Sequence, residues 1–159
     1  NTAIRMELAG ISPKGCTPSV NSHKFSLRVL TEDIMKIACK PADPKNNIEA
    51  VFIKEINRPF VDFCLILARV WSDFGHGEPT ITSGADGKHG INSYHYKGLA
   101  WDVRIWGMSE TEAEQVANAL RRELTEIHHA FQAVYGDKAH KDHIHVEYDL
   151  KKAGGVIYG

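Results

Sequence analysis

Hydrophobic residues recur along this chain with two different spacings, and each spacing predicts a type of secondary structure. After Asn57-Arg58-Pro59, apolar side chains recur every three or four residues, which predicts an amphipathic helix that ends near Gly75. Asn57 suits the cap position, and Pro59 suits the first turn, where its missing N–H costs nothing. The predicted core-facing stripe consists of Phe60, Phe63, Cys64, Leu67, Val70 and Trp71.

Two further helices are expected. Ser109-Glu110-Thr111-Glu112 is a capping-box pattern, and the apolar residues that follow it predict a helix to about Thr125. A short helix from about Thr31 to Cys39 is expected as well, with Thr31 as its cap. Residues 1–47 contain too few apolar side chains for a core of their own. We therefore expect them to form an N-terminal wrap on a single domain that spans residues 1–159.

Alternation of apolar and polar residues predicts the strands. Between Leu99 and Ile105 every second residue is apolar, so that Asp102 lies on the opposite face of the strand. Thr80 to Ser83 is a short β-like run, and two more strands are predicted at Phe131–Tyr135 and His143–Tyr148. In the last of these, His143, His145 and Glu147 share one face.

Composition narrows the class of protein. The 159 residues fit one domain, and 43% hydrophobic and 25% charged residues are typical of a globular protein. A net charge of −1 gives no reason to expect a nucleic-acid or anionic-membrane partner. We find neither an apolar run long enough for a membrane span nor a signal-peptide core, and so expect synthesis in the cytoplasm.

The three cysteines indicate neither a disulfide framework nor a thiolate metal site. Cys16, Cys39 and Cys64 are odd in number and far apart, without a Cys-x-x-Cys unit. Cys64 lies within an apolar run, and we expect it to serve as a small buried hydrophobe.

The chemistry-bearing residues cluster in two places. His95 precedes Asp102 by seven residues across Gly98, and the Asp142-His143-Ile144-His145 segment follows about forty residues later. Two imidazoles and a carboxylate suit a divalent metal of the zinc type, and three protein ligands leave a fourth position open. A further carboxylate nearby is what hydrolysis needs as a base.

The roles within the second cluster remain open at this point. In a regular strand Asp142 would face away from His143 and His145, so it can reach the site only if the strand begins at His143. His143 is either a fourth ligand, which would close the site, or a neighbour that hydrogen-bonds the substrate. The carboxylate of Asp142 favours the second role, because it has an obvious task only in a catalytic site.

These motifs resemble those of the M15 zinc peptidases, which comprise D-Ala-D-Ala carboxypeptidases and dipeptidases and phage L-alanyl-D-glutamate endolysins. The shared pattern is Ser-x-His-x-x-Gly-x-Ala-x-Asp followed by Asp-x-x-His, and it covers about residues 57–148, including Thr82-Ser83-Gly84. Its positions in this chain are Ser93, His95, Gly98, Ala100, Asp102, Asp142 and His145, with a second histidine at His143.

The resemblance implies that His95, Asp102 and His145 bind Zn²⁺ and that Asp142 is the catalytic base. It also implies an α+β fold shared with Hedgehog signalling domains, in which a small, mostly antiparallel sheet carries the zinc site and helices flank it. Many members have an arginine just after the Ser-Gly pair, where this chain has Ala85-Asp86. Candidate substitutes for this arginine in polarising the scissile carbonyl are Lys88 and Arg104, and His143 is expected to bind the substrate beside them.

The resemblance therefore predicts a monomeric zinc peptidase that hydrolyses peptidoglycan stem peptides at the bacterial cell wall, as a phage or prophage lysin would. The sequence leaves open whether it is an L-Ala-D-Glu endopeptidase or a D-Ala-D-Ala carboxypeptidase. The alternative is a Hedgehog-like binding module with a zinc site that does not catalyse, against which the Asp142 carboxylate argues. A small domain without metal would not account for the histidine–carboxylate cluster.

Overall fold

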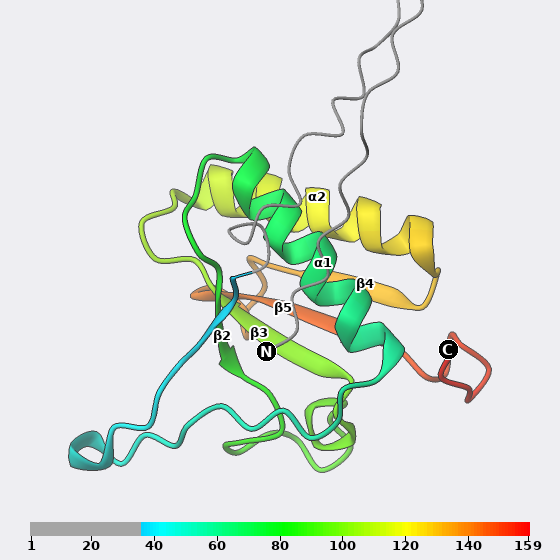
Figure 1. Cartoon of the computed structure of the whole chain (residues 1–159), viewed down its shortest axis with the longest axis horizontal. Coiled ribbons are helices and arrows are strands. Elements are labelled where there is room, and N and C mark those ends of the chain that lie inside the picture. Colours follow the sequence, from blue (N-terminus) through cyan, green and yellow to red (C-terminus); the bar gives the residue numbers. More distant parts are fainter. Residues whose placement is uncertain (1–35) are drawn as a thin grey trace, which may run out of the picture.

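The computed structural model describes residues 36–159, which form an α+β fold with a five-stranded mixed sheet (Figure 1). The strand order is β1-β2-β3-β5-β4; β1 runs parallel to β2, and the other three pairs are antiparallel. The strands span Ala38–Cys39 (β1), Thr80–Ser83 (β2), Ala100–Arg104 (β3), Phe131–Val134 (β4) and His143–Tyr148 (β5). The four strands predicted from alternation are thus confirmed, to within one residue at each end.

The helix α1 spans Arg58–Asp73 and begins where the sequence predicts. The Asn57 side chain accepts a hydrogen bond from the Phe60 N–H at 3.0 Å, which satisfies one of the free donors of the first turn. Most of the predicted stripe is buried, whereas Phe60 and Cys64 are half-buried. Burial raises the pKa of the Cys64 thiol to about 12, so it stays protonated and packs as an apolar group.

The helix α2 spans Glu110–Ile127, and the Ser109 hydroxyl accepts a hydrogen bond from the Glu112 N–H at 3.2 Å, as the capping pattern predicts. Both long helices cover the same face of the sheet (Figure 1). The Phe63 ring of α1 stacks on Trp101 of β3, with ring centroids 4.9 Å apart. Because Trp101 points toward the helices, Asp102 points to the other face of the sheet.

The predicted helix from about Thr31 to Cys39 is wrong where the structure describes it, and residues 31–35 lie outside the described part. Ala38–Cys39 is instead the edge strand β1. The Ala38 N–H donates to the Pro79 carbonyl and the Lys40 N–H to the Ile81 carbonyl, both at 2.9 Å. An isolated helix of this length is marginal in water, and pairing with the sheet edge satisfies the same backbone groups.

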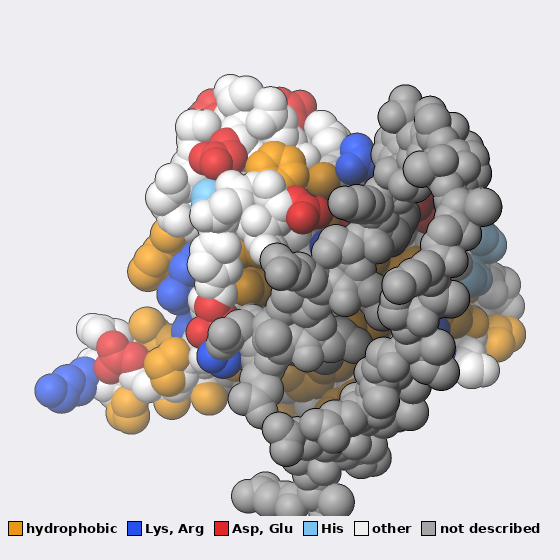
Figure 2. Space-filling model, turned by 45° about the horizontal axis from the view of Figure 1, so that its top comes forward, with side chains coloured by type: hydrophobic (Ala, Val, Ile, Leu, Met, Phe, Trp, Pro, Cys, Tyr) orange, Lys and Arg blue, Asp and Glu red, His pale blue; other side chains and the backbone are white. Residues whose placement is uncertain are grey.

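Residues 36–47 are the described part of the predicted N-terminal wrap. After β1 they lead into the short 3₁₀ helix η1, Pro44–Asn46, which projects from the body of the molecule (Figure 1). Hydrophobic side chains gather along this projecting segment (Figure 2), and Ile48 and Phe52 are 40% and 58% exposed. In residues 36–159 no helix is both long and apolar enough to cross a bilayer.

A buried carboxylate ties the C-terminal segment to the start of α1. Asp62 is 4% exposed and accepts hydrogen bonds from Arg58 Nε at 2.8 Å and from the Tyr158 hydroxyl at 2.6 Å. A buried carboxylate needs such donors, because removing one leaves the charge partly unsatisfied.

We therefore expect Tyr158→Phe to lower the free energy of unfolding by roughly 1.5–3 kcal/mol, the typical worth of a hydrogen bond to a charged group. Urea denaturation followed by circular dichroism measures this change. Tyr135→Phe is the matched control, because in the described part of the chain the Tyr135 hydroxyl has no hydrogen bond. Equal unfolding midpoints for the two variants would show that the Tyr158–Asp62 bond contributes nothing.

Candidate metal centre

The pairing of β3 with β5 brings polar residues together on the sheet face that the helices leave uncovered. Asp102 lies directly opposite His145, and Arg104 lies opposite His143. Cβ atoms of such cross-strand pairs are about 5 Å apart, close enough for the side chains to share a ligand. Register alone therefore places one carboxylate and one imidazole of the predicted site side by side.

His95 reaches the same point from a separate element. It opens the 3₁₀ helix η2, His95–Lys97, and Gly98 follows with φ of +70°, a conformation that favours glycine. The Gly98 N–H donates to the His95 carbonyl at 2.9 Å, and the Leu99 N–H donates to the Tyr94 carbonyl at 3.0 Å. This tight turn sends the chain back into β3, so His95, at 3% exposure, lies buried beside the strand that follows it.

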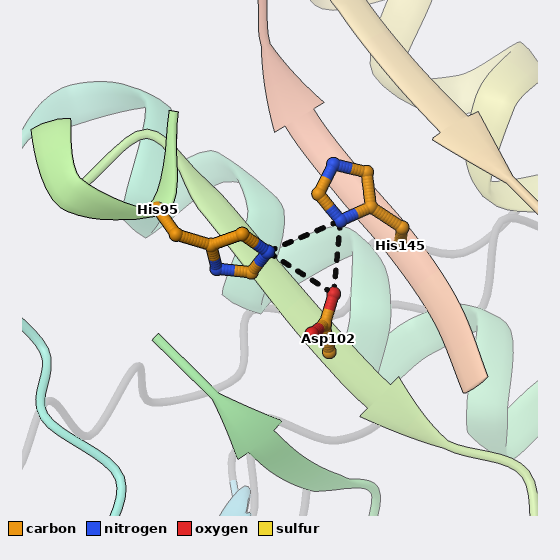
Figure 3. Close-up of side chains that lie close together, drawn as sticks. All are labelled: His95, Asp102 and His145. Carbon is orange, nitrogen blue, oxygen red and sulfur yellow. Dashed lines mark hydrogen bonds and ion pairs between the residues drawn. The ribbon is translucent and has the colours of Figure 1, made fainter. Parts of the chain in front are cut away.

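Three ligand atoms converge where these elements meet (Figure 3). Asp102 Oδ1 lies 2.9 Å from His145 Nδ1 and 3.3 Å from His95 Nε2, and the two ring nitrogens are 3.3 Å apart. Among the described residues these three form a group that could hold a metal ion. The predicted ligand set is therefore brought together by the fold.

The outer ring nitrogens of both histidines are fixed by acceptors. His95 Nδ1 lies 2.8 Å from the Gly84 carbonyl oxygen, and His145 Nε2 lies 3.2 Å from Glu147 Oε2. Neither acceptor can donate, so each outer nitrogen carries the hydrogen and leaves the inner nitrogen with a lone pair. When both rings are neutral, two lone pairs and a carboxylate oxygen face one another without a donor between them. The three atoms therefore favour a positive charge among them, either a proton on one ring or a bound metal ion.

The titration of these groups reflects the same need for a cation. Burial opposes protonation of His145, but its hydrogen bonds to Asp102 and Glu147 outweigh this and raise its pKa to about 9. Burial also opposes ionisation of Asp102, yet hydrogen bonds from His145 and His95 hold the pKa of that carboxyl well below its usual range. A proton therefore occupies the centre of the cluster when no metal does, and metal binding must displace it.

The segment after β2 supplies the carbonyl that orients His95. The β2–β3 register shifts between Ile81 and Ser83, a bulge that redirects the chain next to the site. Gly84 passes so close to a neighbouring backbone that a Cβ there would lie 2.5 Å from the Phe52 carbonyl oxygen. Buried Asp86 fixes both segments, since its Oδ1 accepts from the Gly84 N–H at 2.7 Å and from the Phe52 N–H at 3.0 Å. Asp86 thus has a structural task at the place where the resembling peptidases often have an arginine.

The cluster opens into a cleft of about 520 Å³. His89 forms part of its wall and stacks on His95 with ring centroids 3.9 Å apart and planes 8° from parallel. The His89 Nε2 donates to the Asp86 carbonyl at 2.7 Å, and burial together with neighbouring His95 lowers the pKa of His89. Beside the three candidate ligands, the cleft is lined by Lys88, His89, Gly90, Ser93, Ala139, His140, His143 and Glu147.

Asp142 does not line this cleft. The strand β5 begins at His143, so Asp142 lies in the entering bend, as a base would require. Its side chain, however, is 90% exposed, and Oδ1 accepts a hydrogen bond from His143 Nδ1 at 2.7 Å, which lowers the pKa of Asp142. His143 Nε2 in turn lies 3.6 Å from Asp102 Oδ1. Asp142 is thus connected to the site through His143.

The other predicted substrate-binding residues lie in different places. Lys88 is exposed and borders the cleft, whereas Arg104 lines a separate pocket and stacks on Trp106. Sequence reasoning missed His140, which borders the cleft and whose Nδ1 lies 2.7 Å from Asp137 Oδ1. The signal in the sequence is an aspartate, Asp137, three residues before a histidine in a turn region.

Comparison with known proteins adds no family assignment, since neither a protein-family model nor a curated protein matches this chain.

We expect the wild-type protein to bind about one metal ion per chain, and His95→Ala and His145→Ala to abolish this binding. Each substitution leaves only two protein donors at the centre. Elemental analysis of the dialysed proteins by mass spectrometry measures occupancy. His129→Ala serves as the control, because His129 is exposed, does not line the cleft, and lies 2.9 Å from the Lys152 carbonyl oxygen through its Nε2. Full occupancy in both ligand variants would refute the assignment.

Proposed function

We propose that this protein is a zinc-dependent peptidase that hydrolyses the stem peptides of bacterial peptidoglycan. The observation that carries the proposal is the convergence of His95 Nε2, Asp102 Oδ1 and His145 Nδ1 on one point in an open cleft. Two imidazoles and one carboxylate suit zinc, and three protein ligands leave room for a substrate. The resemblance to the M15 peptidases supports the substrate class and a Hedgehog-like fold.

Zinc in this position supplies Lewis-acid polarisation of a carbonyl group and activation of water at neutral pH. The protein must then accept a proton from the attacking water and return it to the leaving amine. His143 is arranged to do so, because Nδ1 donates to Asp142 and Nε2 faces the ligand carboxylate. Asp142 holds the ring in this tautomer and stabilises its protonated form, as the carboxylate does in other carboxylate–histidine pairs.

In this proposal Asp142 is not itself the base that the resemblance implies; His143 takes the proton, and Asp142 acts on the reaction through His143. To act directly as the base, the Asp142 carboxylate, whose side chain is 90% exposed, would have to turn into the cleft toward the attacking water. Lys88 at the border of the cleft can neutralise a carboxylate of the stem peptide. A cleft of about 520 Å³ lies within the range of small-ligand sites, which suits a short peptide rather than a folded protein.

The exposed position of Asp142 also favours a second candidate, a zinc-containing binding module that does not catalyse. In such a module Asp142 and His143 would form only a surface ion pair. Among residues 36–159, Glu147 is the one carboxylate besides Asp102 that lines the cleft, and it is engaged by His145 and by the Gln132 amide, the latter at 3.1 Å. Activity measurements separate the two candidates.

We expect the purified protein to release new amino groups from peptidoglycan, to leave casein intact, and to lose activity on chelation of its metal. Mass spectrometry of the released muropeptides identifies the bond that is cut, and so distinguishes an endopeptidase from a carboxypeptidase. Efficient casein cleavage would contradict the assignment to peptidoglycan. Binding of stem peptides without any cleavage would favour the binding module.

Asp142→Asn tests the proposed proton path. Asparagine can still accept the hydrogen bond from His143 Nδ1, but it no longer carries a charge. We expect near-normal metal content and a fall in kcat by a factor on the order of 10²–10⁴, the usual contribution of a positioned general base. Asp73→Asn is the control, since Asp73 is exposed at the end of α1.

His143→Gln shows whether the path runs through the imidazole. A loss comparable to that of Asp142→Asn supports a coupled pair, whereas a small loss means that Asp142 acts directly. Loss of metal from the Asp142→Asn protein would indicate that Asp142 is a metal ligand. Full activity with full metal content would indicate that Glu147 is the base, because it shares a strand face with His145.

A further inference from the structure

At the end of β3 an arginine stacks over the ring of an exposed tryptophan, and this pair is called the platform below. Trp106 is 78% exposed, and the Arg104 guanidinium carbon lies 3.9 Å from the centroid of the indole ring. Among the described residues, the Arg104 guanidinium stacks on this ring and makes no hydrogen bond or ion pair. Its N–H donors at the edge of the platform are therefore available to a ligand.

This platform belongs to the same side of the sheet as the metal centre. Arg104 follows Asp102 by two residues on β3, so the two side chains share a face and their Cα atoms are about 7 Å apart. The cross-strand partner of Arg104 is His143, which borders the metal cleft. Arg104 and Trp106 also line a separate pocket of about 180 Å³, whose other lining residues are Trp71, His76, Gly77, Glu78, Thr80 and Met108. The connection to the metal cleft runs through His143, the strand partner of Arg104.

The chemistry of the platform fits a sugar ring. An indole face in water is a large apolar surface that gains free energy when it is covered, and an aromatic ring accepts the C–H face of a pyranose. The guanidinium lies over one face of the indole and leaves the other face open, and its N–H groups can reach hydroxyl and acetamide oxygens only at the rim of the ring. A peptide carboxylate would need only Arg104 and would leave the exposed indole without a function.

We infer that Arg104 and Trp106 bind an N-acetylated pyranose of the peptidoglycan glycan strand while the attached stem peptide occupies the metal cleft. The inference rests on the proposed peptidase function for its substrate, but sugar binding at Trp106 can be measured without any catalysis. It assigns Arg104 to the glycan rather than to the scissile peptide, and it makes Trp106 a specificity-determining residue.

Two measurements test this inference. The first is calorimetric titration with chitotetraose, a tetramer of N-acetylglucosamine that carries no peptide. The second compares cleavage of a disaccharide-peptide with that of the same peptide without sugar. We expect wild-type protein to bind chitotetraose and to favour the sugar-bearing substrate through a lower KM. Trp106→Ala should raise the Kd for chitotetraose and the KM for the sugar-bearing substrate about tenfold, the scale for loss of one aromatic anchor.

The kcat of Trp106→Ala should stay unchanged, as should its KM for the sugar-free peptide. Trp106→Phe should retain most of the preference because it keeps an aromatic face. Phe52→Ala is the matched control, an exposed aromatic residue on the projecting segment. Circular dichroism of each variant verifies that the fold is intact.

The possible outcomes separate this inference from the proposed function. Chitotetraose binding that depends on Trp106, in a protein that cleaves no muropeptide, would support the platform and contradict the peptidase. Cleavage with equal KM values for both substrates would contradict the platform and leave the peptidase intact. An equal rise in both KM values in Trp106→Ala would mean that the platform binds the peptide, and would overturn the sugar assignment.

Discussion

The arrangement of this site depends on one electrostatic constraint, which is that three acceptor atoms face one another at hydrogen-bond distance. His95 Nε2, His145 Nδ1 and Asp102 Oδ1 lie 2.9 to 3.3 Å from one another. They face one another because the other nitrogen of each ring is hydrogen-bonded on the outer side. Gly84 and Glu147 supply the acceptors that fix the two rings. Such a cluster needs a positive charge, and a metal ion is one that can contact all three atoms at once, so the group could hold a metal ion.

A small sheet can carry this polar site because both helices pack on its opposite face. Because α1 and α2 cover only one face, the apolar side chains of β3 and β5 are buried there, and the alternate side chains can be polar. Trp101 is fixed by stacking on Phe63, and so the backbone that carries Asp102 is anchored by the core. The same alternation extends the polar face to His143 and Arg104, which links the metal cleft to the exposed Trp106 platform.

The loop between β2 and β3 and the bend before β5 differ from what the resemblance to the M15 peptidases leads one to expect. Buried Asp86 holds the Gly84 segment through backbone amides, at a place where an arginine would be expected. Asp142 is bonded to His143 at the surface instead of facing the ligands. Both features shift the polar chemistry of the cleft toward its histidines, of which His89 and His140 lie in its wall beside His143.

The sequence by itself determined most of the elements and the candidate metal ligands, because local periodicity reports which face of a helix or strand is buried. It predicted the Asn57 and Ser109 caps, the strand boundaries around Asp102 and His145, and the three residues that converge. Only the tertiary structure decided which acceptors orient the rings, where Asp142 points, and that Ala38–Cys39 joins the sheet edge. Those features depend on contacts between segments that are distant in sequence, such as Gly84 with Phe52 and His95, and no local pattern encodes such contacts.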